Sequence, residues 1–145
     1  MRYFNTILTL ALLALVFISP KVFAGDYAIV VNSANSAAAD LSEVKNLYLK
    51  KKTSWDGGGE SVPLGREAGS PEQEAFLRAV LGMSQSDLDG YWASEKSKTG
   101  ATGPREVGST SILLRQVSRK DGAFGVVSAA DANSLPEGVK VLARF

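Results

Sequence analysis

The chain has 145 residues, with 16 Lys and Arg, 15 Asp and Glu, and a formal net charge of +1 at pH 7. It has no His and no Cys, which excludes Ser-His-Asp catalysis, haem ligation by His, the usual zinc sites, disulfides and thiol chemistry. A nearly neutral domain also lacks the broad field that attracts nucleic acid or anionic membranes. We therefore expect that the protein has no nucleic-acid partner, binds no metal or other cofactor, and is not an enzyme.

Residues 1–24 have the layout of a secretory signal peptide. Arg2 gives a basic start, an apolar run follows over residues 7–18, and small side chains lead to Ala24. This run is shorter than the roughly 20 apolar residues that span a bilayer. We expect cleavage after Ala24, export to the periplasm, and no membrane span afterwards. Because Cys is missing, the exported protein is not a lipoprotein, and residues 25–145 suit one domain.

The domain begins with a strand and a helix. The β-branched run "YAIVVN" at residues 27–32 is typical of a buried strand. Ser42 is a candidate N-cap for a helix from Glu43 to about Lys50. Its apolar residues recur at helical spacing: Val44, Leu47 and Tyr48. A Gly-rich loop over 51–60 then leads to a short strand over 61–65.

A well-capped helix follows the second strand. In "SPEQEAF", Ser70 is a favoured N-cap, Pro71 fits the first helical position, and Gln73 completes a capping box. Gly82 is a natural C-terminal stop for this helix. The expected buried stripe comprises Phe76, Leu77, Val80 and Leu81.

Two more helices are expected in the second half. Ser84 together with Asp87 indicates a helix start. The buried face of that helix would consist of Leu88, Tyr91 and Trp92. Residues 96–107 are polar and Gly-rich, which predicts a surface connection. Ser109 then opens a further amphipathic helix.

The last elements complete an α/β layered domain. Asp121 and Gly122 end the preceding helix, and a strand is expected over 123–128. Gly125 within it indicates a close approach by another segment. A final strand is expected over 139–143. Strands that alternate with amphipathic helices predict a mixed sheet flanked by helices.

The stretch "LGREAGSPEQEAF" combines two features that favour an anion. A helix N-terminus presents unpaired N–H groups and partial positive charge, and Arg66 in the preceding segment can clamp an oxyanion. The Ser70 hydroxyl can add a hydrogen bond. However, Pro71 has no N–H, and Glu72 brings a negative charge into the first turn. The alternative interpretation is a loop followed by a capped helix, with no ligand.

Four segments carry a family resemblance in order: "AIVVNSAN", "DLSEVKNLYLKKKTSWDGGGESVPL", "SPEQEAFLRAVLGMSQSDLDGYW" and "DGAFGVVSA". Together they resemble the phosphate ABC transporter substrate-binding protein family, and most closely its short, single-lobe exported members. The resemblance covers residues 27–145. It implies a single type 2 periplasmic-binding-protein-like lobe.

The same resemblance implies a site. Full-length phosphate binders hold the anion between two lobes, partly with an Arg followed by a Ser-Gly-Thr turn at a helix start. Arg66 occupies the Arg position and Ser70 the Ser position, whereas Pro71 and Glu72 replace Gly-Thr. A single lobe would leave the anion half in water, so we expect weak binding. The candidate ligand-binding residues are Arg66, Gly69, Ser70, Glu72 and Gln73.

Two functions follow from these observations. The first is an exported solute-binding-like protein that binds phosphate or another small oxyanion weakly. In that case a partner lobe or a second copy of the chain would complete the cleft. The alternative is a non-transport interaction module that uses the lobe as a scaffold, with a periplasmic protein as its partner. Fold alone does not decide between them.

Overall fold

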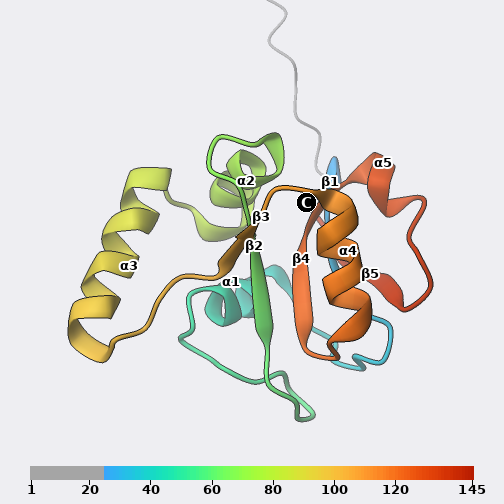
Figure 1. The fold of residues 1–145 in the computed structure, drawn as a ribbon, viewed down its shortest axis with the longest axis horizontal. Helices are drawn as coiled ribbons and strands as arrows, with labels where there is room; N and C mark the ends of the chain where they lie inside the picture. The colour runs from blue at the N-terminus through green and yellow to red at the C-terminus, as the bar shows by residue number, and fades with distance from the viewer. Residues whose placement is uncertain (1–24) are drawn as a thin grey trace, which may run out of the picture.

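The computed structural model describes residues 25–145, which form a mixed sheet between two layers of helices (Figure 1). The strands are β1 (Tyr27–Asn32), β2 (Val62–Arg66), β3 (Arg105–Val107), β4 (Ala123–Ser128) and β5 (Val139–Arg144). Their order is β3-β2-β4-β1-β5, with β2 parallel to β3 and β4, and β1 antiparallel to β4 and β5. The predicted α/β fold is confirmed, whereas the predicted signal peptide, residues 1–24, lies outside the described residues.

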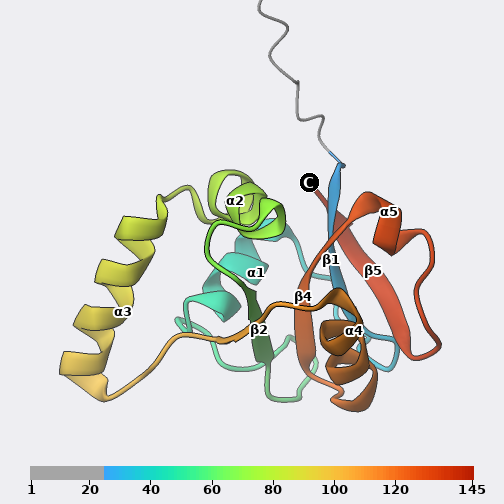
Figure 2. The same cartoon turned by 45° about the horizontal axis from the view of Figure 1, so that its top comes forward.

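The helices divide between the two faces of the sheet (Figures 1 and 2). They are α1 (Leu41–Tyr48), α2 (Pro71–Phe76), the π-helical turn η1 (Leu77–Leu81), α3 (Gln85–Thr99), α4 (Thr110–Arg119) and α5 (Ala129–Ala132). One apolar cluster joins α1, α2 and η1 to the sheet, and a second joins α4 and α5 to the opposite face. Figures 1 and 2 both show α3 standing away from the sheet.

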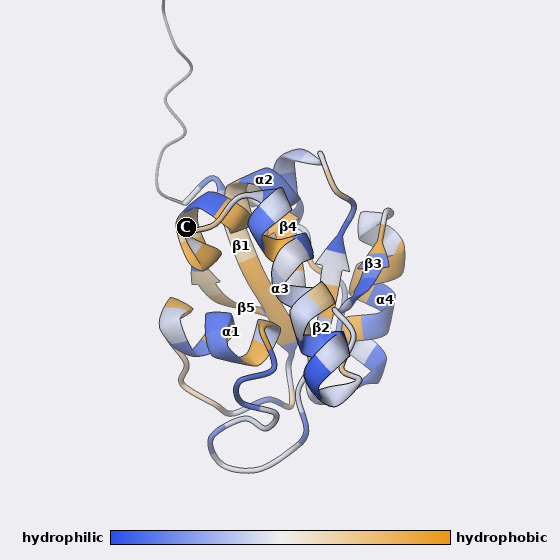
Figure 3. Cartoon of the chain, turned by 90° about the vertical axis from the view of Figure 1, so that its left-hand side faces the viewer, coloured by the Kyte–Doolittle hydropathy of each residue, from blue (hydrophilic) through white to orange (hydrophobic). Residues whose placement is uncertain are grey.

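β1 supplies apolar side chains to both clusters. Ile29 and Val31 lie in the α1 cluster, while Ala28 and Val30 lie in the α4 cluster, and all four are fully buried. Successive side chains of a strand point to opposite faces, so a strand covered on both sides must be apolar throughout. Figure 3 shows the hydrophobic colouring of β1 inside the layers. This explains why "YAIVVN" predicts its strand so well.

Gly125 brings α4 close to the sheet, as its position predicts. A methyl group at Gly125 would lie 2.8 Å from Cδ1 of Leu113, which is fully buried in α4. Residue 125 is paired with Val30 in the antiparallel β1–β4 ladder. The missing side chain therefore lets Leu113 pack directly onto the backbone of β4.

Buried side-chain contacts, one aromatic and one polar, connect α1 to α2. The rings of Tyr48 and Phe76 meet edge to face, with centroids 4.8 Å apart. The Gln73 side chain hydrogen-bonds Tyr48 and is only 3% exposed. Burial raises the pKa of the Tyr48 phenol to about 12, an effect that the Gln73 hydrogen bond opposes and that the negative charge of Glu106 reinforces.

The predicted N-caps are confirmed in three helices, including Ser70 in α2, and wrong in one. Ser84 and Asp87 form the predicted capping box, and Ser109 caps α4. α1, however, starts at Leu41 with Asp40 as its N-cap, so the predicted cap Ser42 is wrong. Asp40 can cap a helix as Ser42 can, and its carboxylate accepts from the Glu43 backbone N–H. The helix therefore starts two residues earlier than expected.

The capping box predicted at Ser70 is only half formed. The Ser70 hydroxyl accepts from the Gln73 backbone N–H at 3.2 Å. The Ser70 backbone N–H donates instead to the Glu67 carbonyl, at 3.1 Å. Because the Gln73 side chain is engaged with Tyr48, it does not return to the cap.

The surface connection predicted over residues 96–107 is partly wrong. α3 continues to Thr99, and residues 105–107 form the edge strand β3. Three residues with only Val107 buried give too short an apolar pattern to indicate a strand. The short helix α5 and the π-helical turn before Gly82 were also not predicted, although Gly82 ends that turn with φ 65° as expected.

Replacement of Gly125 by Ala should destabilise the protein by about 1–3 kcal/mol, because the new methyl group overlaps buried Leu113. Gly90→Ala is the matched control. Gly90 lies in α3, where an added methyl group would have no atom within 4 Å, so Ala there should raise the free energy of unfolding by up to about 1 kcal/mol. Urea unfolding of both variants measures the difference. Equal stabilities for Gly125→Ala and the parent would contradict the close approach.

The Tyr48 phenol should make stability depend on alkaline pH. Below pH 10 it is protonated in the folded and the unfolded chain, so it contributes no pH dependence. Between pH 10 and about 12 only the unfolded chain releases this proton, so the free energy of unfolding should fall by about 2–3 kcal/mol. Tyr48→Phe should lack this component. A stability difference between the two proteins that stays constant from pH 9 to 12 in urea titrations would refute it.

Candidate functional site

The predicted site residues lie at the carboxyl end of β2. This strand ends at Arg66, and α2 begins at Pro71 after a short loop. The neighbouring parallel strand β3 ends at Val107 and leads into α4. The N-termini of α2 and α4 therefore both follow this edge of the sheet, where α/β folds commonly hold ligands.

Arg66 is buried at this edge, with 5% of its surface exposed. Its Nη2 donates to Oγ1 of Thr110 at 3.1 Å and to the carbonyl of Gly108 at a long 3.5 Å. Nη1 reaches the Val126 carbonyl, also at 3.5 Å. Nε has no hydrogen-bond partner within residues 25–145. One good hydrogen bond for five N–H donors leaves this cation poorly satisfied.

Glu72 supplies the nearest opposite charge. Its Oε1 lies 3.9 Å from Nη2 of Arg66, and its side chain is 18% exposed. A charge-assisted hydrogen bond would bring the atoms to about 2.7–2.9 Å, so this contact is an ion pair without direct hydrogen bonding. The carboxylate is more exposed than the guanidinium and lies beside its Nη2.

The other predicted residues have different environments. Gly69 is exposed in the loop, with φ 83°, a conformation that favours Gly. The Ser70 hydroxyl already accepts from the helix backbone. The Gln73 side chain points into the core toward Tyr48. The structure thus brings Arg66 and Glu72 together and directs Gln73 away from them.

Sequence reasoning missed the groups that hold Arg66. Thr110 and Gly108 come from the β3–α4 connection, and Val126 comes from β4. Thr110 directly follows the predicted N-cap Ser109, so its place at a helix start could be predicted. Its closeness to Arg66 could not, because that depends on the unpredicted pairing of β2 with β3. That pairing is visible only in the folded chain.

The arrangement suits an anion better than a metal. Besides the Glu72 carboxylate, its polar groups are a guanidinium, hydroxyls and the backbone N–H groups of a helix start, all of which can donate hydrogen bonds. No group of three or more His, Cys, Asp or Glu residues is placed to hold a metal ion within residues 25–145. In the same part of the chain, no helix has the length and apolarity to cross a membrane.

Comparison with known proteins identifies the fold. Neither a protein-family model nor a curated protein matches this chain. A solved structure from Clostridium perfringens, assigned as a phosphate ABC transporter substrate-binding protein with bound phosphate, matches with a TM-score of 0.62 and 21% identity. An ABC-type phosphate transport receptor from Vibrio cholerae gives 0.60 and 20%, and PstS from Borrelia burgdorferi gives 0.58 and 11%.

These matches cover most of this chain but less than half of each solved chain. They cover 82%, 83% and 83% of this chain but only 44%, 47% and 49% of the three solved chains, respectively. The chain therefore spans about half the length of the structures that it matches. The resemblance expected from the sequence is confirmed for the fold: residues 25–145 form a single lobe of the kind found in phosphate ABC transporter substrate-binding proteins.

Proposed function

We propose that this chain is an exported, solute-binding-like protein of the periplasm whose Arg66 corner binds a small inorganic oxyanion, with phosphate as the first candidate. The observation that carries the proposal is the buried Arg66 guanidinium, whose Nε has no partner among residues 25–145. A buried cation with weak acceptors is costly to maintain, and an oxyanion would supply both charge and hydrogen-bond acceptors. The shared fold with phosphate-binding receptors supports the same choice of ligand.

Glu72 sets the strength of this binding. An incoming oxyanion would meet its carboxylate next to Nη2 of Arg66. The like charges repel, so the carboxylate must turn outward before the anion can approach. Pro71 adds a second loss, since it has no N–H to donate at the helix start. Weak binding, in the millimolar range or just below, is the expected result.

A second candidate function rests on α3. This helix has 15 residues, and Leu88 is the one that is buried. Tyr91 and Trp92 anchor it through a hydrogen bond to the Leu49 carbonyl and through contact with Gly103. The C-terminal part of the helix, residues 96–99, is exposed. A helix that is anchored at one end and exposed at the other suits an interaction module, for a periplasmic partner or a second copy.

Calorimetric titration with phosphate and sulfate tests the oxyanion proposal. The parent protein should release or absorb measurable heat at millimolar anion, and Arg66→Ala should abolish it. Glu72→Gln should tighten binding by roughly 3- to 10-fold, because it removes the competing charge from the corner.

Glu74→Gln is the matched control for that variant. Glu74 lies in the same first turn of α2 but is not paired with Arg66, so its loss should change affinity by less than about twofold. An absence of heat from both the parent and Glu72→Gln would eliminate oxyanion binding at this corner. Equal gains from Glu72→Gln and Glu74→Gln would instead indicate a general charge effect.

The interaction candidate predicts that α3 determines association. If α3 binds a partner or a second copy, reversing exposed charges at Asp89 and Lys96 should weaken the complex in sedimentation or pull-down from periplasmic extract. The same reversals should leave the fold intact, because both side chains are exposed. A protein that sediments as a monomer and recovers no partner, with or without the reversals, would exclude this function.

A further inference from the structure

A cavity, here named the β2 notch, lies along the edge of β2 and is not lined by Arg66. Its floor consists of Val62, Pro63 and Leu64. β3 pairs with β2 only from Leu64 onward, while Val62 and Pro63 pair with β4 on their other side. The departure of β3 leaves a cavity of about 360 Å³, which is within the range of small-molecule pockets.

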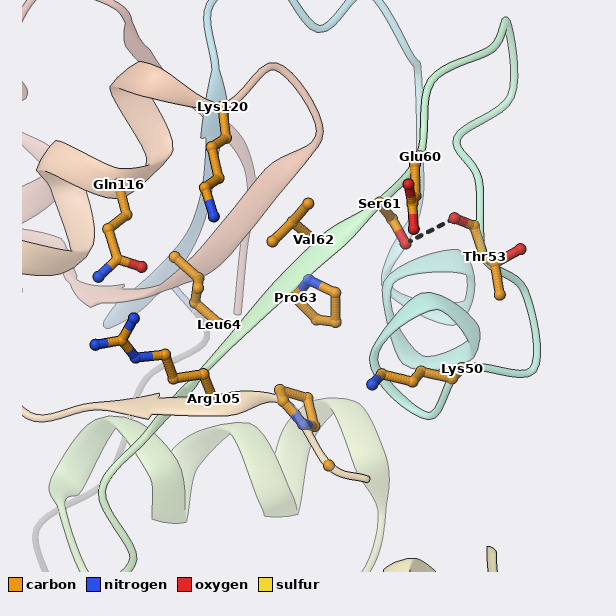
Figure 4. A pocket seen from close by; sticks show the side chains of 12 residues that line it. Lys50, Thr53, Glu60, Ser61, Val62, Pro63, Leu64, Arg105, Gln116 and Lys120 are labelled. Atoms are coloured by element: carbon orange, nitrogen blue, oxygen red, sulfur yellow. Dashed lines mark hydrogen bonds between the residues drawn. The ribbon is translucent and has the colours of Figure 1, made fainter. Parts of the chain in front are cut away.

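Cations from three separate segments border the β2 notch. Arg105 begins β3, Lys120 ends α4, and Lys50 follows α1. Figure 4 shows the ends of the Arg105, Lys120 and Gln116 side chains on one side of Val62 and Leu64, across the pocket from Lys50. The three cations thus approach one apolar floor from different parts of the fold.

These positive charges are not neutralised by residues 25–145. Lys50 donates to the Thr102 carbonyl at 2.7 Å, which fixes its position without cancelling its charge. Within the same described range, the side chains of Arg105, Lys120 and Gln116 have no hydrogen bond or ion pair, and neither has Glu60, the one carboxylate that lines the notch. The local balance is therefore cationic over an apolar surface.

We propose that the β2 notch binds a small organic anion, a carboxylate or phosphate monoester that carries an apolar group. Its acid group would lie among Arg105, Lys120 and Gln116, where a guanidinium, an ammonium and an amide can all donate hydrogen bonds. Its apolar group would lie against Val62 and Pro63, which are partly exposed, and remove them from water, while Leu64 is already buried. This combination distinguishes the notch from the Arg66 corner, where the donor is a single buried guanidinium beside a carboxylate.

NMR measurement of amide chemical shifts tests this proposal. The isotopically labelled protein is used in the form in which the expressing cell exports it. The probes are phenyl phosphate, benzoate, inorganic phosphate and uncharged benzyl alcohol. Phenyl phosphate or benzoate should give saturable shifts at residues 61–65, 103–105 and 116–120. Inorganic phosphate and benzyl alcohol should each bind there at least about tenfold more weakly, because each lacks one half of the recognition. The two acids compared with each other decide which headgroup the notch prefers.

Arg105→Gln and Lys120→Gln should each weaken the tighter acid by about three- to tenfold, as expected for a partly screened contact. Lys140→Gln is the control, since Lys140 is also exposed but lies on β5, at the far edge of the sheet. Equal effects of all three variants, or binding as strong by benzyl alcohol as by the acids, would overturn the proposal. Glu72→Gln alters the Arg66 corner without removing its buried cation and should leave these shifts unchanged, so failure at the notch and failure at the Arg66 corner are distinguishable.

Discussion

The buried guanidinium of Arg66 is the constraint on which the carboxyl edge of the sheet depends. A cation at 5% exposure loses most of its hydration and must find acceptors in the protein. Those acceptors come from three places, namely the β3–α4 connection, β4 and the first turn of α2. The side chain therefore links four segments that are distant in sequence. Two of its contacts to carbonyls are long, and its Nε finds no acceptor among residues 25–145, so this edge keeps donors that the described residues do not satisfy.

The sequence predicted the layers well because their signals are local. β1 and β4 are buried on both faces and must be apolar along their length, and the helix starts at Ser70, Ser84 and Ser109 are set by side chains within three residues. Gly125 was interpretable for the same reason, since a missing side chain inside an apolar strand usually marks a close approach. Asp40 shows the limit: two capping candidates that lie two residues apart, Asp40 and Ser42, differ little in energy, so the start of α1 was misplaced.

What the sequence could not provide depends on long-range pairing. β3 has only three residues and gains its place from β2, so nothing within it indicates a strand. The partners of Arg66 at Gly108 and Thr110 follow from that pairing, and so does the β2 notch, which exists because β3 departs from β2 before Pro63. Both candidate sites therefore rest on the element that was missed, although Arg66 itself was identified from its place before a helix.

The two sites differ in physical character. At the Arg66 corner one desolvated charge faces one carboxylate, so the geometry of a few atoms and the position of Glu72 decide whether an anion enters. Salt screens such a buried pair only weakly. In the β2 notch several hydrated charges surround an apolar floor, so recognition depends on the apolar part of the ligand as much as on its charge. Solvent screens each of those charges strongly, and a bare inorganic ion would gain little there over its hydration. The two proposed sites of this lobe thus favour different ligands. The buried charge of Arg66 favours a small inorganic ion, whereas the exposed, screened charges of the β2 notch favour an organic acid whose apolar group adds to the binding.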